Sequence, residues 1–83
     1  MLIKKIYTSF KREEFIDFFN KIGEQKSDGV YYGKGWEVVI GDEKNKLIGT
    51  IPFVTVDLTI EIEDEISKEF IDKLRLAFLR GGG

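Results

Sequence analysis

The clearest pattern in the chain is a strict alternation of apolar and polar residues from Val54 to Ile62. Every second side chain there is aliphatic, and threonine, aspartate or glutamate stands at each position between. Successive side chains of a strand point to opposite faces of a sheet, so this alternation gives one apolar and one polar face. It predicts an antiparallel strand with one face on the core and the other in water.

Two other segments show the helical period of apolar residues. The first, from about Lys11 to Ile22, follows Thr8 and Ser9, which are favourable helix caps, and precedes Gly23, a helix stop. The second runs from Ser67, its expected cap, to about Arg80. Their predicted core stripes are Phe15, Ile16, Phe18, Phe19 and Ile22 in the first helix, and Phe70, Ile71, Leu74, Ala77 and Phe78 in the second.

The remaining apolar runs predict short strands at residues 2–7, 30–33, 36–40 and 46–51, with a turn at residues 42–45. Pro52 cannot donate to a strand ladder and therefore marks a bend, a bulge or an edge. The pattern leaves open whether residues 46–62 form one bent strand or two.

These elements predict an α+β fold in the order β-α-β-β-β(-β)-α. We expect a two-layer sandwich, with an antiparallel sheet of four to five strands and both helices on one face. The chain has 83 residues, which is enough for one core, so residues 1–80 are expected to form a single domain and residues 81–83 a glycine tail.

The composition excludes most familiar catalytic sites, because the chain contains neither histidine nor cysteine. Serine–histidine and cysteine–histidine nucleophiles and the usual zinc sites cannot be built without these residues. The acidic run Glu63-Asp64-Glu65 lacks the spacing of a calcium loop and suits the positive end of the following helix. We therefore predict a protein that is not an enzyme, with no catalytic residues, cofactor or metal.

Charge and hydropathy favour a cytoplasmic protein. The net charge is −2, and the longest uncharged stretch in the body, Leu47 to Val56, is too short to span a membrane. Residues 1–5 do not resemble a secretory signal. Ten lysines and nine glutamates against two asparagines and one glutamine also resemble the composition of hyperthermophile proteins.

The second helix carries more leucine than its core stripe needs. Leu76 and Leu79 project away from that stripe, so they are predicted to be exposed and are our candidate interface residues. The expected partner is a second copy of the chain, or else another protein. The open face of the sheet and an edge near Pro52 are rival surfaces.

A glycine-rich aromatic segment, residues 28–36, offers a different function. Tyr31, Lys34 and Trp36 are candidate ligand-binding residues, because aromatic rings beside a lysine can stack and hold single-stranded nucleic acid. The simpler interpretation is a tight hairpin with Tyr32 and Trp36 in the core. Without the first strand, the element order α-β-β-β-α is similar to that of double-stranded-RNA-binding domains, but the acidic start of the last helix would repel phosphates.

The last residues, Leu79-Arg80-Gly81-Gly82-Gly83, are similar to the Leu-Arg-Gly-Gly tail of ubiquitin-like modifiers and sulfur carriers. That resemblance implies a terminal glycine that is adenylated by a partner enzyme and then conjugated or thiolated. A third glycine follows here, and the tail leaves a predicted helix instead of a strand. The alternative is a helix end followed by a frayed tail.

Overall fold

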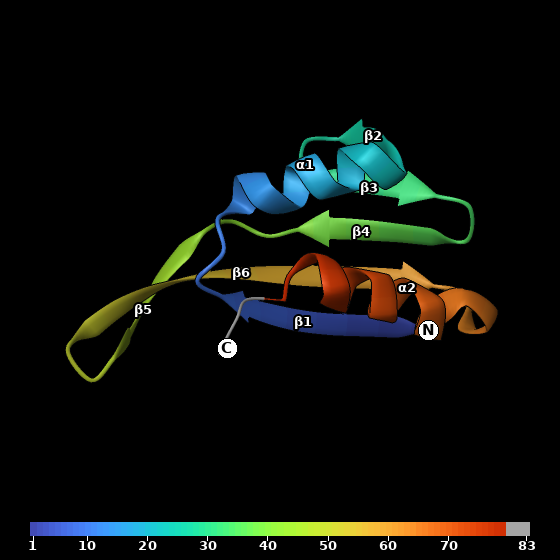
Figure 1. Ribbon diagram of the computed structural model, residues 1–83. Helices are drawn as coiled ribbons and strands as arrows, with labels where there is room; N and C mark the ends of the chain where they lie inside the picture. The colour runs from blue at the N-terminus through green and yellow to red at the C-terminus, as the bar shows by residue number, and fades with distance from the viewer. Residues whose placement is uncertain (80–83) are drawn as a thin grey trace.

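The computed structural model describes residues 1–79, which form six strands and two helices (Figure 1). In chain order they are β1 (Leu2–Thr8), α1 (Arg12–Ile22), β2 (Glu24–Ser27), β3 (Val30–Gly33), β4 (Trp36–Ile40), β5 (Lys44–Ile48), β6 (Ile51–Ile62) and α2 (Asp64–Ala77). Residues 80–83, including the predicted end of the second helix at Arg80 and the glycine tail, lie outside the described residues.

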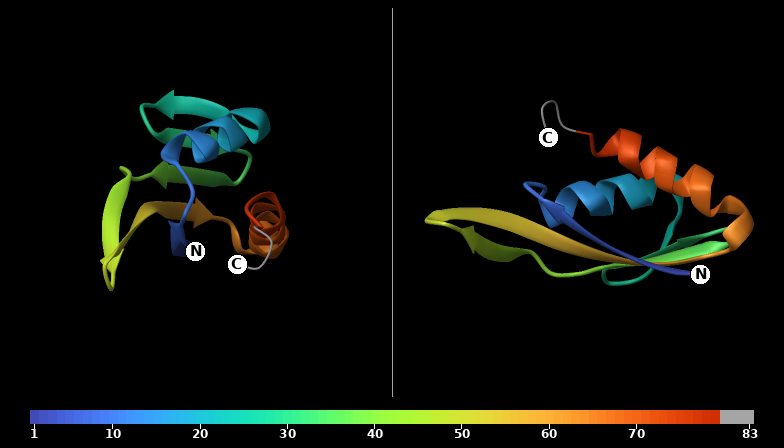
Figure 2. Two further views of the ribbon diagram at one scale, coloured as in Figure 1. Left: turned by 60° about the vertical axis from the view of Figure 1, so that its left-hand side comes forward. Right: turned by 90° about the horizontal axis from the view of Figure 1, so that it is seen from below.

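All strand pairs are antiparallel, and the sheet has the order β1-β6-β4-β3-β2. The long strand β6 is central: its later residues lie between β1 and β4, and its first residues pair with β5. Both helices lie on the same face of the sheet (Figure 2). The predicted α+β fold is therefore confirmed, with six strands in place of four to five.

The core lies between the helices and the inward face of the sheet. The alternation in β6 is confirmed from Val56 to Ile62, where every second side chain is almost fully buried. Phe15 and Phe19 of α1 and Phe70 and Leu74 of α2 pack on this face. No helix formed by residues 1–79 covers the other face of the sheet (Figure 2).

Strand β2 has no counterpart in the sequence prediction. All four of its residues are exposed, and it pairs with β3 through a register irregularity between Gln25 and Ser27. A strand without a buried face has no apolar alternation, so the pattern that revealed β6 is missing here.

The predicted turn at residues 42–45 was wrong, and the strand predicted at 46–51 is present as β5 with its bounds shifted to Lys44–Ile48. Residues 41–43 connect two strands that follow one another along β6, and Gly41 N–H donates to the carbonyl of Asp57 (2.8 Å). The chain reverses instead at Gly49-Thr50, where Gly49 has a φ of 66°. Glycine suits the first central position of a two-residue hairpin turn. Residues 46–62 are therefore two strands, β5 and β6.

Both helix starts differ from the predicted caps. Lys11 precedes α1, and its backbone N–H donates to the Glu14 carboxylate (2.7 Å), so neither Thr8 nor Ser9 caps this helix. Glu63 precedes α2, and the Ser67 hydroxyl donates to the carbonyl of Asp64 within the first turn.

Candidate functional site

The C-terminal end of α2 presents the two predicted interface residues to solvent. Leu76 is 75% exposed and Leu79 is 65% exposed, which agrees with the helical pattern. Ala77, predicted to belong to the core stripe, is exposed as well, so that prediction was wrong at this position.

Phe78 fixes the orientation of this end. Its ring stacks on Phe15 at a centroid distance of 4.3 Å and contacts Tyr7 at 5.9 Å, and its backbone N–H donates to the carbonyl of Leu74 (3.1 Å). Since Phe78 is held against the core, its neighbours Leu76 and Leu79 are directed outward. The described chain therefore ends in an exposed apolar patch, formed by Leu76 and Leu79, beside a phenylalanine that packs on the core.

The three candidate ligand-binding residues on the β3–β4 hairpin differ in their exposure to solvent. Tyr31 is 2% exposed and belongs to the core, so its ring offers no face to a ligand. Tyr32, which the simpler interpretation placed in the core, points outward because neighbouring strand residues face opposite sides. Its hydroxyl donates to the Glu24 carboxylate (2.9 Å), and this hydrogen bond raises the pKa of Tyr32.

Trp36 is half-buried and has mainly a packing role. Its ring lies 5.8 Å from Phe19 and 5.1 Å from Phe70, measured between centroids, and it covers Gly33 so closely that a Cβ there would come within 2.5 Å of Nε1. Trp36 and the exposed Lys34 do line one small cavity of about 160 Å³ between the helices. Of the three residues in the nucleic-acid hypothesis, Lys34 and part of Trp36 are therefore accessible to a ligand, whereas Tyr31 is not.

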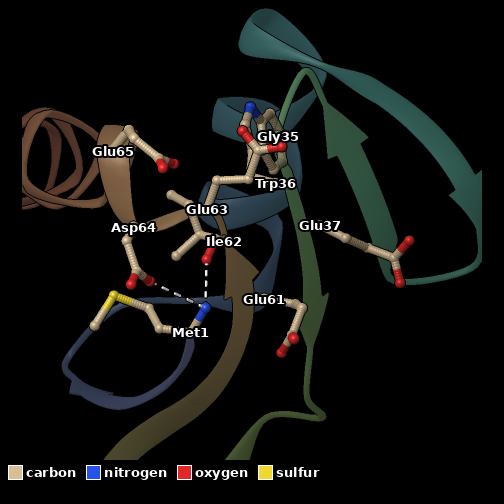
Figure 3. A pocket seen from close by; sticks show the side chains of 9 residues that line it. All are labelled: Met1, Gly35, Trp36, Glu37, Glu61, Ile62, Glu63, Asp64 and Glu65. Atoms are coloured by element: carbon tan, nitrogen blue, oxygen red, sulfur yellow. Dashed lines mark hydrogen bonds and ion pairs between the residues drawn. The ribbon is translucent and has the colours of Figure 1, made fainter.

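A larger, shallow cavity of about 500 Å³ (Figure 3) lies near the N-terminus, at the end of the sheet opposite the β5–β6 turn (Figure 1). Five carboxylates line it, those of Glu37, Glu61, Glu63, Asp64 and Glu65. The Met1 ammonium donates to the carbonyl of Ile62 (2.6 Å) and lies 3.5 Å from Asp64 Oδ1. Among residues 1–79, no three acidic side chains are placed to hold a metal ion. The charge of this cavity opposes the binding of phosphates.

Two further groups of exposed apolar side chains are alternatives to the α2 patch as a contact surface. Leu2, Ile6 and Val39 lie on the open face of the sheet, and Leu47, Ile48 and Ile51 lie on the hairpin of β5 and β6. The predicted edge near Pro52 lies on this hairpin, but the exposed residues of the hairpin were not identified because the turn was placed too early in the sequence. The sequence feature that indicates this hairpin is Gly49-Thr50 between the two apolar residues Ile48 and Ile51.

Comparisons with known proteins place the chain in a family. Residues 3–83 match the family model described as archaeal MoaD-like protein. No curated protein matches the chain. Within residues 1–79, no helix is long and apolar enough to cross a membrane. Because the match covers nearly the whole chain, this protein belongs to the archaeal MoaD-like protein family.

Proposed function

We propose that this protein is a cytoplasmic homodimer that acts through protein–protein contact and has no catalytic centre of its own. The observation that carries the proposal is the exposed pair Leu76 and Leu79 at a helix end that Phe78 anchors. The free energy falls when a partner covers large aliphatic side chains that are otherwise exposed to water. A second copy supplies the same patch through a two-fold axis.

Dimer formation would also compensate for the small hydrophobic core of a domain of this length. Domains of this length have small cores, and those without disulfides or metals gain stability by association. The chain has no cysteine, and the described residues hold no group suited to a metal. Burial of Leu76 and Leu79 between two copies would add apolar contact without enlarging either core.

The double substitution Leu76→Lys and Leu79→Lys tests the interface. It should convert the dimer to a monomer in light scattering and leave the circular dichroism spectrum unchanged, because both side chains are outside the core. The matched control is Leu2→Lys with Ile6→Lys, which adds the same charge to the open sheet face. If only the control variant dissociates, the sheet face is the interface and the proposal fails.

The C-terminal tail supports a second candidate function. The family match continues through residue 83, so it includes all three terminal glycines. A tail that follows the apolar α2 patch could be guided by it into the channel of an adenylating enzyme. The terminal carboxylate would then attack the α-phosphate of ATP, forming an acyl adenylate and releasing pyrophosphate.

Mass spectrometry with ATP and an E1-like adenylating enzyme tests this second candidate. The intact chain should gain the mass of AMP at its C-terminus, and a chain lacking Gly83 should not. Equal reaction of the two chains, or no reaction of either, would count against a conjugable tail.

A further inference from the structure

Among the strands of residues 1–79, β1 is an edge of the sheet with no neighbour on its outer side (Figure 1). At one end of the β1–β6 ladder, Met1 and Ile62 exchange two backbone hydrogen bonds, of 2.6 and 2.9 Å. At the other end, Ser9 N–H donates to the carbonyl of Val54 (2.8 Å). Bonded residues alternate along an antiparallel strand, so odd-numbered residues of β1 bond to β6. The even-numbered ones direct their N–H and C=O groups outward, namely Leu2, Lys4, Ile6 and Thr8.

This edge differs from the others that the described residues offer. Strand β2, at the far side of the sheet, has four residues and an irregular register. Strand β5 has five residues and belongs to the hairpin that extends from the sheet (Figure 1). Strand β1 has seven residues in unbroken register with β6. Regular, unpaired edges of this kind are sites where another strand can add.

Cations gather along the same edge. Lys4 is exposed on the open face, and Lys5 is half-buried on the face toward the helices. Above them, Arg75 of α2 lies near Tyr7: burial raises the pKa of Tyr7, and the charge of Arg75 opposes that rise. Lys68 stands two helical turns before Arg75, on the same side of α2. Within residues 1–79, none of these four cations forms an ion pair.

The acids of β6 and of the first turn of α2 do not pair with these cations, whereas Asp72 stands one turn from both Lys68 and Arg75 on α2 and offsets part of their charge. Asp57, the cross-strand partner of Ile6, lies 3.8 Å from Lys44, and Asp64 lies 3.5 Å from the Met1 ammonium. Glu61 stands opposite Leu2, at the start of the strand. The middle and end of β1 are therefore basic, in a chain whose net charge is −2.

We propose that the β1 edge binds an extended acidic segment of a partner protein, which adds to the sheet as a further strand. The outward N–H and C=O groups of the even-numbered residues would supply the backbone bonds. Two adjacent acids in the segment would face Lys4 and Lys5 on opposite sides of the sheet, and an apolar side chain would cover Ile6, which is 72% exposed. A second copy of the chain fits this edge less well, because it would bring the same cations to the seam from both sides.

Amide hydrogen exchange followed by NMR tests the proposal, with the blocked synthetic peptide Thr-Val-Glu-Glu-Val-Val-Thr as the probe. In the free protein, the amides of Ile3, Lys5 and Tyr7 should exchange slowly and those of Lys4 and Ile6 rapidly. The peptide should slow the exchange of Lys4 and Ile6. A peptide with both glutamates replaced by lysine should not, and protection by both peptides or by neither would overturn the proposal.

Two substitutions at one position separate backbone pairing from side-chain contact. Ile6→Pro removes an outward N–H that makes no bond to β6, so the fold should tolerate it. It should weaken peptide binding at least roughly tenfold, because a donor is lost and the ring obstructs the added strand. Ile6→Thr keeps the donor and should bind within about threefold of the parent. Equal affinities of the two variants would contradict strand addition.

A second pair of variants tests the charge. Lys4→Glu should weaken binding of the acidic peptide roughly fivefold, and added salt should reduce the difference. Lys46→Glu makes the same charge change at an exposed position of β5 and should have no effect. Equal weakening by both would show a general charge effect and overturn the assignment to β1. So would a single-stranded oligonucleotide that shifts the lysine resonances when the peptide does not protect the amides.

Discussion

The two faces of α2 carry similar leucines that meet opposite environments. Leu74 is 1% exposed and packs between the helix and the sheet, whereas Leu76, two residues later, is 75% exposed. The chemical nature of the side chain is the same, so only its direction around the helix axis separates the two roles. The inner face accounts for the stability of a single chain. The outer face is available for contact between chains.

The first prediction concerns the inner face and has the largest expected effect. Leu74→Ala should lower the free energy of unfolding by about 2–5 kcal/mol, because it leaves a cavity under a packed helix. Leu76→Ala, the matched change on the outer face, should alter the stability of the monomer by less than about 0.5 kcal/mol. Urea denaturation at low protein concentration measures both. Similar losses would mean that the two faces are not distinct.

Phe78→Ala tests how the inner face supports the outer one. The loss of ring contacts to Phe15 and Tyr7 should cost about 2 kcal/mol of stability. It should also weaken the proposed dimer, although Leu76 and Leu79 are unchanged, because the helix end is no longer held. Sedimentation equilibrium gives the dimer constant. An unaltered constant in the folded variant would show that the patch needs no anchor.

Asp72→Leu sharpens the comparison by enlarging the outer face. Asp72 is exposed one turn before Leu76 on the same side of α2, so a leucine there would extend the apolar patch. The proposed dimer should tighten by a factor of about 3–10, the effect of roughly 1 kcal/mol of added burial. Lys73→Leu, on the side of α2 that lines the small cavity between the helices, is the control. Equal tightening by both would point to nonspecific association.

The smallest effect is expected at Tyr7, beneath the end of α2. Burial raises the pKa of Tyr7 above its ordinary value of 10.0, and the charge of Arg75 lowers it. Folding therefore favours the neutral phenol, so its contribution to stability is complete below pH 10 and is lost as the pH rises through the folded pKa.

An ultraviolet titration in a Tyr31→Phe and Tyr32→Phe background isolates this group, because these two residues are the other tyrosines of the chain. Tyr7 should ionise at a higher pH than free tyrosine, and Arg75→Gln should move it higher still. A normal pKa in the folded chain would show that the end of α2 does not cover Tyr7.

The sequence predicted those parts of the fold in which one face is buried. Strand β6 and the inner residues of both helices followed from periodicity, because burial selects apolar residues at a fixed spacing. Strand β2 is exposed throughout and left no such pattern. The turn of the β5–β6 hairpin was misplaced because the polar run at residues 42–45 has the composition of a turn. In the structure, Arg12 binds the segment that leads into this run. The Arg12 side chain donates to the Gly41 carbonyl (3.0 Å), and its backbone N–H donates to the Glu43 carboxylate (2.7 Å).

The candidate sites were less predictable than the fold. The exposure of Leu76 and Leu79 followed from helix geometry alone. The direction of the Tyr31 side chain did not follow from the sequence. Tyr31 and Tyr32 are adjacent in one strand, and only the register with β4 decides which of the two points toward the core. The basic edge of β1 depends on which strand is its neighbour and on where α2 lies, and neither is visible in a local pattern.

Light scattering across a concentration series tests the central claim most directly. The account predicts a mass of twice 9.6 kDa that persists on dilution into the micromolar range and falls to the monomer mass in the Leu76→Lys, Leu79→Lys variant. A parent chain that is monomeric at every concentration would contradict the proposed homodimer.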